Sequence, residues 1–133
     1  MNGPPGGRTV TTTTITVCET CKREDWAAGT PRTHGEELAA LVERAAEGTG
    51  VAVRRHACLM GCDRACNVSL QAPGKMCYTL GRFEPSAEAA EGIVAYAALH
   101  AAAPGGVVPY RTWPAAIKGH FVTRHPPLPT DAE

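Results

Sequence analysis

The sequence lacks an excess of charge of either sign, because Lys and Arg number 13 and Asp and Glu also number 13. A balanced surface offers no field that would attract nucleic acid or an anionic membrane, so neither is an expected partner. No stretch approaches the roughly 20 apolar residues of a membrane-spanning helix. The first residues, MNGPPGGRTV, also lack the basic and apolar regions of a signal peptide. These absences predict a soluble, cytoplasmic protein.

The sequence also lacks the residue patterns of the common enzyme classes. It contains no Ser/His/acid arrangement and no Gly-rich motif that would cradle a phosphate. Its five histidines show no metal-ligand spacing, and a Rieske-type centre would need histidines close behind its loop cysteines. His56 lies near Cys58, but we expect it to end a strand. The sequence therefore favours an electron carrier or metal-binding protein over an enzyme.

Six cysteines are the most informative feature that is present, and five of them fall in two short motifs. Cys18 and Cys21 form the motif CETC, and Cys58, Cys62 and Cys66 lie within CLMGCDRAC. Because the cytosol keeps thiols reduced, metal binding or redox chemistry is a better explanation there than a structural disulfide framework. Soft thiolates favour zinc, Cu(I) or iron–sulfur clusters over hard cations.

The hydrophobic pattern predicts an α/β fold with a thioredoxin-like layout. Residues 9–17 and 51–56 have the β-branched composition of strands, and residues 67–72 and 75–81 suit a hairpin around a Pro-Gly turn. Residues 33–48 fit a helix that begins with a capping box of Thr33 and Glu36, and residues 86–103 fit a second helix capped by Ser86. The expected core is a central mixed sheet of about four strands with two main helices.

Three segments are expected along the chain. Residues 1–8 form a flexible N-terminus, residues 9–103 form the thioredoxin-like metal- or cluster-binding domain, and residues 104–133 form an extended Pro-rich segment. Trp113 and Tyr110 are expected to anchor this last segment to the domain.

The predicted topology brings the two thiol motifs together. The strands at 9–17 and 51–56 should be parallel neighbours, so Cys18 and Cys58 would emerge at the same edge of the sheet. A [2Fe–2S] cluster needs two thiolates for each iron, and each loop could supply one pair. A four-cysteine zinc site is the main alternative. A thiol–disulfide redox protein is a weaker one, because the expected helix start at Thr33 lies far from Cys21 in the sequence.

The stretch CLMGCDRACNVSLQAPGKMCYTL resembles the second half of the thioredoxin-like [2Fe–2S] ferredoxins. The joint pattern of TVCETCKR, CLMGC and a further cysteine resembles an uncharacterised bacterial family of predicted metal-binding proteins placed beside those ferredoxins. This resemblance extends over residues 13–127, including VPYRTWP and RHPP in the C-terminal segment. It implies a [2Fe–2S] centre, electron transfer to a redox partner protein, and a homodimer.

The resemblance also implies a set of ligands. Cys58 and Cys62 match the C-x3-C ligands of those ferredoxins, and Cys18 matches the ligand at the end of the first strand. Cys21 is the natural substitute for the fourth ligand, with Cys66 as an alternative. Cys77, inside a predicted strand, is expected to be a small buried hydrophobe.

Overall fold

A computed structural model describes residues 12–59 and 65–129 and contains one five-stranded sheet. The strands are β1 (Thr14–Cys18), β2 (Ala52–His56), β3 (Val68–Gln71), β4 (Cys77–Leu80) and β5 (Phe121–His125). Their order across the sheet is β2-β1-β3-β4-β5. β1 is parallel to β2, and all other neighbours are antiparallel. The predicted α/β fold with a mixed sheet is therefore confirmed.

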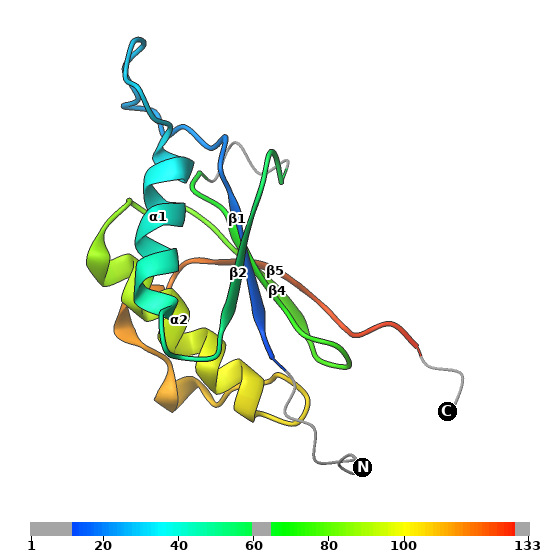
Figure 1. The fold of residues 1–133 in the computed structure, drawn as a ribbon. Helices are drawn as coiled ribbons and strands as arrows, with labels where there is room; N and C mark the ends of the chain where they lie inside the picture. Colours follow the sequence, from blue (N-terminus) through cyan, green and yellow to red (C-terminus); the bar gives the residue numbers. More distant parts are fainter. Residues whose placement is uncertain (1–11, 60–64, 130–133) are drawn as a thin grey trace.

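Two helices, α1 (His34–Ala46) and α2 (Ala87–Ala102), lie side by side against one face of this sheet (Figure 1). Side chains alternate across a strand, so every second residue faces the helices. The residues that do so are buried and apolar: Ile15, Val17, Val68, Leu70, Tyr78 and Leu80. They form the core with the buried faces of the two helices, which include Leu38, Val42, Ile93 and Ala97.

The predicted helix starts are confirmed at the level of single hydrogen bonds. Thr33 Oγ1 accepts from the Glu36 backbone N–H at 3.0 Å, and Glu36 Oε1 accepts from the Thr33 N–H at 2.9 Å. Ser86 Oγ accepts from the Ala89 N–H at 3.0 Å. These side chains satisfy backbone donors that a helix start leaves unpaired, which fixes where each helix begins.

The C-terminal segment adds a strand to the expected sheet. Before β5 the chain makes two short 3-10 helices, η3 (Tyr110–Thr112) and η4 (Ala115–Ile117). Trp113 docks as predicted, with its ring 4.5 Å from that of Phe121. Tyr110 remains 61% exposed, so the anchoring role expected of it is wrong. Among the described residues, no helix is both long enough and apolar enough to cross a membrane.

The opposite face of the sheet carries a different set of side chains. Thr14, Thr16, Arg54, Ser69 and Cys77 lie on this face, because they alternate with the core residues of their strands. Within the described chain, neither helix covers it (Figure 1). We call this the open face of the sheet.

A buried histidine ties α2 to the sheet. His100 is fully buried, with Nδ1 2.8 Å from Thr13 Oγ1 and Nε2 2.7 Å from the Met76 carbonyl oxygen. Because a carbonyl can only accept, Nε2 carries the proton and Nδ1 accepts from the threonine hydroxyl. Burial holds the pKa of His100 below its ordinary value; the bond to Met76 opposes this effect, and the positive charge of Lys75 adds to it.

Acidification should therefore destabilise the fold through His100. The unfolded chain takes up a proton on this histidine near pH 6.5 while the folded chain does not, so stability present above that pH is lost as the pH falls. We expect the free energy of unfolding, measured by urea denaturation, to fall between pH 7.5 and 5.5. The fall should be smaller in His100→Gln and unchanged in His125→Gln, which alters an exposed histidine. If the free energy of unfolding depends equally on pH in the original protein, His100→Gln and His125→Gln, His100 is not the group responsible.

Candidate functional site

The carboxyl ends of β1 and β2 lie next to each other, which brings the CETC motif and Cys58 to the same end of the sheet (Figure 1). Cys18 is in register with His56, the last residue of β2. The Glu19 N–H donates to the His56 carbonyl at 2.9 Å and continues the pairing past both strands. The parallel pairing that the sequence predicts for these strands is thus confirmed.

Three buried cysteines meet at this end of the sheet. Cys18, Cys21 and Cys66 are 2%, 3% and 0% exposed. Asn67, which follows Cys66, accepts from the Cys18 N–H at 3.0 Å through its carbonyl oxygen. Its side-chain Nδ2 donates to Cys21 Sγ at 3.5 Å. Asn67 therefore joins the start of β3 to the CETC motif.

The surroundings of Cys18 and Cys21 shift their acidities in opposite directions. Burial opposes ionisation of Cys18, but hydrogen bonds from the Cys21 thiol, the Leu59 backbone and Thr20 outweigh it and hold the pKa of Cys18 below its ordinary value. Burial raises the pKa of Cys21 to about 11; Asn67 opposes the rise and Cys18 adds to it. The Leu59 contact also brings the segment after β2 against the sulfur of Cys18.

The surroundings of Cys66 oppose ionisation of its thiol. Burial and the neighbouring charges of Cys21 and Cys18 raise its pKa to about 12, while Arg23 acts in the opposite direction. Cys66 thus shares its electrostatic environment with both thiols of the CETC motif. The sequence makes it only an alternative to the four expected ligands, because it falls where the ferredoxins that the motif resembles usually have a non-ligand.

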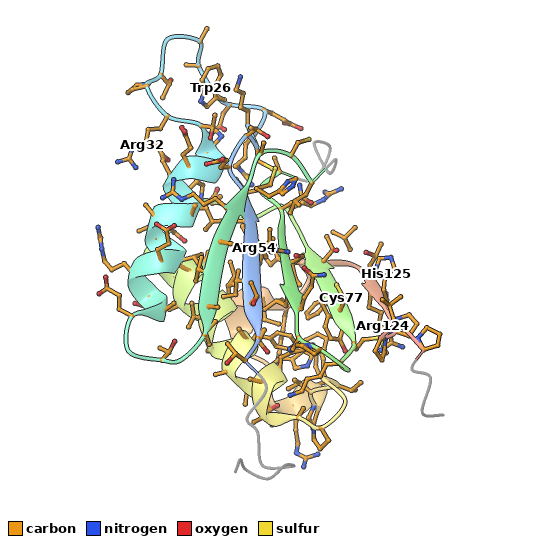
Figure 2. All side chains as sticks on the ribbon, turned by 45° about the vertical axis from the view of Figure 1, so that its right-hand side comes forward. Trp26, Arg32, Arg54, Cys77, Arg124 and His125 are labelled. Atoms are coloured by element: carbon orange, nitrogen blue, oxygen red, sulfur yellow. The ribbon has the colours of Figure 1, made fainter. Side chains whose placement is uncertain are left out.

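The N-terminus of α1 packs directly against the CETC loop. The Gly35 N–H donates to the Cys21 carbonyl at 2.9 Å, and the Thr33 hydroxyl donates to the Glu19 carbonyl. The intervening residues 22–32 form a loop that projects away and returns, and Trp26 marks it in Figure 2. The helix starts at the predicted place, far from Cys21 in the sequence, but it lies against the CETC loop in space, so this distance does not argue against the thiol–disulfide alternative.

Arg23 fastens this loop to Ala65, which precedes Cys66, and to the segment that follows β4, a role that the sequence did not reveal. Its Nη1 donates to the carbonyl oxygens of Phe83 at 3.0 Å, Arg82 at 3.1 Å and Ala65 at 3.4 Å. Nη1 carries two N–H groups, which these three carbonyl oxygens share. The sequence placed Arg23 only close to a cysteine, since its three acceptors lie more than forty positions away.

The remaining expected site residues lie in different places. Cys58 is exposed beyond β2, and its N–H lies 3.4 Å from His56 Nδ1. Cys62 lies outside the described residues. Cys77 begins β4 at the far end of the sheet and is only partly buried, so the expectation of a buried hydrophobe is wrong. Its place on the open face gives it less cover than the helix-facing residues of the same strand.

The described residues do not form a complete metal site. In residues 12–59 and 65–129, no three Cys, His, Asp or Glu side chains are grouped so that they could hold a metal ion. Cys18 and Cys21 nevertheless form a hydrogen-bonded pair, with Cys66 in their electrostatic field. This arrangement offers a ready pair of sulfur ligands, or a dithiol.

The fold and the site together define a small cysteine-rich α/β domain. Residues 15–127 match the family described as "Protein of unknown function (DUF1636)". The chain therefore belongs to the DUF1636 family. No curated protein and no solved structure shows significant similarity to it.

This membership corrects the family assignment made from the cysteine motifs. The match over residues 15–127 is to a family of unknown function and not to the thioredoxin-like [2Fe–2S] ferredoxins. C-x2-C and C-x3-C spacings with a Pro/Gly-turned hairpin are too short to identify a ferredoxin, since several kinds of thiol site share them. The ligand set must therefore be argued from this chain's own residues.

Proposed function

We propose that this protein binds a thiolate-ligated [2Fe–2S] cluster and passes single electrons to a partner protein. The observation that carries the proposal is the buried, hydrogen-bonded pair Cys18 and Cys21 at the carboxyl end of β1, next to the end of β2, which Cys58 follows. Buried thiols without disulfide partners suit metal ligation, because thiolates are the soft ligands that iron–sulfur clusters require. The cluster would supply the redox chemistry, and the protein would set its potential and its docking.

The donor set fits such a centre. Cys18 and Cys21 would supply one pair of sulfurs and Cys58 and Cys62 the second, with Cys66 as the alternative fourth ligand. The burial of Cys66 beside Cys21 supports it more strongly than its spacing in the sequence does. Hydrogen bonds from the Leu59 backbone to Cys18 and from Asn67 Nδ2 to Cys21 would stabilise sulfur ligands in their ionised form.

A thiol–disulfide function is the second candidate. It is favoured by the hydrogen bond between the Cys18 and Cys21 thiols and by the packing of the α1 N-terminus on their loop. The burial of both sulfurs argues against it, because an attacking thiolate must reach its substrate. We therefore rank it behind the metal centre.

The first experiment is a visible spectrum of protein purified without oxygen, followed by iron, sulfide and zinc analysis of the same sample. A brown protein with about two irons and two sulfides per chain is the expected result. A colourless protein with about one zinc would replace the cluster with a four-cysteine zinc site and end the electron-transfer proposal. Metal-free protein with a reversible Cys18–Cys21 disulfide would favour the thiol–disulfide candidate.

We also propose that the protein acts in the cytoplasm. A site built from several reduced cysteines is best supported in a compartment that keeps thiols reduced. Fractionation of cells that produce the chain with a C-terminal tag tests this location, with recovery in the cytoplasmic fraction as the expected result.

A further inference from the structure

A groove of about 730 Å³ lies on the open face of the sheet, at the end away from Cys18. Its floor includes Arg54 from β2, Gln71 from β3 and Cys77 from β4. One wall is the segment Pro126–Pro129, which follows β5. Figure 2 labels Arg54, Cys77 and His125, which come from three different strands of the sheet. A volume of this size is typical of sites for small organic ligands.

Arg54 is fixed in the groove by neutral partners. Its Nε donates to Thr16 Oγ1 at 2.7 Å, and its Nη2 donates to Gln71 Oε1 at 3.3 Å. Thr16 is itself buried, so the guanidinium is held against the sheet. No carboxylate in the described ranges pairs with Arg54.

Arg55, the next residue of β2, has different hydrogen-bond partners from Arg54. Arg55 lies on the opposite face of β2, and its Nε and Nη2 each donate to a Glu43 carboxylate oxygen at 2.9 Å. Adjacent arginines on one strand thus differ in their partners as well as in their face: Arg55 has a carboxylate partner, whereas the described partners of Arg54 are neutral. A guanidinium whose positive charge is not paired with a carboxylate is well suited to an external oxyanion.

The charged residues that line the groove also favour an anionic ligand. The charged residue types that line it are Arg54, Lys75 and His125, and no lining residue of the described chain is acidic. The Lys75 ammonium donates to the carbonyls of His100 and Ala101, so it adds positive charge without reaching a ligand. Burial raises the pKa of Cys77, which keeps this thiol uncharged at neutral pH.

We propose that this groove binds a small organic anion. A phosphate or carboxylate group would pair with the guanidinium of Arg54, and an apolar body would lie against the prolines and Leu128. Leu128 is 86% exposed in the described structure, so covering it would remove apolar surface from water. This groove lies at the end of the sheet away from Cys18 and Cys21, and the proposal does not depend on the proposed metal centre.

Phenyl phosphate and benzoate are suitable probes, because they share an aromatic body and differ in the charged group. Binding would be followed by amide chemical-shift changes in nitrogen-15-labelled protein, at residues 14, 54, 71 and 77. We expect saturable binding of at least one probe, and the tighter of the two identifies the charged group. Arg54→Gln should weaken binding of that probe about tenfold or more, which is the range for loss of a charge-assisted hydrogen bond. Arg55→Gln is the matched control and should bind as the original protein does.

Two further variants keep the test decisive. Arg54→Lys retains the charge but loses the planar fork, and should weaken binding less than Arg54→Gln. Leu128→Ser should weaken binding of either aromatic probe without affecting the fold, since this side chain is exposed. The proposal is overturned if neither probe saturates the amide shifts, or if folded Arg54→Gln binds as tightly as Arg55→Gln.

Discussion

Gly35→Ala should destabilise the protein by about 3 kcal/mol or more and disrupt the thiol end of the sheet. A β-carbon on residue 35 would overlap the carbonyl oxygen of Cys18 and would lie 2.9 Å from the Glu19 carbonyl carbon and 3.0 Å from the Cys21 nitrogen. These are backbone atoms, so no side-chain rotation can relieve the overlap. The start of α1 or the CETC loop would have to move, and the Gly35 to Cys21 hydrogen bond would be lost.

The matched control is Gly105→Ala, because a β-carbon there meets no atom within 4 Å and the residue lacks a positive φ. Urea denaturation monitored by circular dichroism gives the loss of stability, and metal analysis of both variants shows whether the site is damaged as well. Gly35→Ala should lose stability and, if the proposed centre forms, its metal as well, whereas Gly105→Ala should keep both. A Gly35→Ala protein as stable as Gly105→Ala would mean that α1 does not pack on the loop as described.

The order of helices and strands along the chain could be predicted from local signals in the sequence. Thr33 with Glu36 and Ser86 mark helix starts by hydrogen bonds within four residues, so the sequence itself contains each complete motif. The parallel pairing of β1 with β2 followed from the helix between them, because such a crossover returns the chain in the same direction. These features depend on neighbours in the chain, and pattern reasoning identifies them.

The features that were missed depend on contacts between distant residues. β5 pairs with β4 across more than forty residues, and the prolines on both sides of its FVTRH sequence predicted an extended segment there. Gly35 was unremarkable in the sequence, yet its missing side chain lets α1 reach the CETC loop. The resemblance to the ferredoxins places Cys66 behind the other motif cysteines, whereas the fold buries it within the electrostatic field of Cys21. Burial is a property of the assembled fold, so spacing alone could not rank these thiols.

Serine substitutions of the cysteines should distinguish those that bind the proposed metal centre from those that do not. Cys18→Ser and Cys21→Ser are expected to remove nearly all bound metal, because a serine hydroxyl is neither soft nor readily ionised and cannot replace a thiolate. Cys58→Ser should do the same. Cys77→Ser is the matched control, since it makes the same chemical change at the far end of the sheet. Iron and sulfide content and visible absorbance, normalised to protein, measure the effect.

The comparison of Cys62→Ser with Cys66→Ser assigns the remaining ligand. If Cys62 completes the set, Cys62→Ser loses the metal and Cys66→Ser keeps it; if Cys66 does so, the order reverses. Because Cys66 is fully buried, a serine there also places a hydroxyl among apolar groups, so Cys66→Ala must accompany it to separate ligation from destabilisation. Circular dichroism confirms that each variant is folded before its metal content is compared. Equal metal content in Cys18→Ser and Cys77→Ser would rule out the thiol cluster as the binding site, because these two residues lie at opposite ends of the sheet.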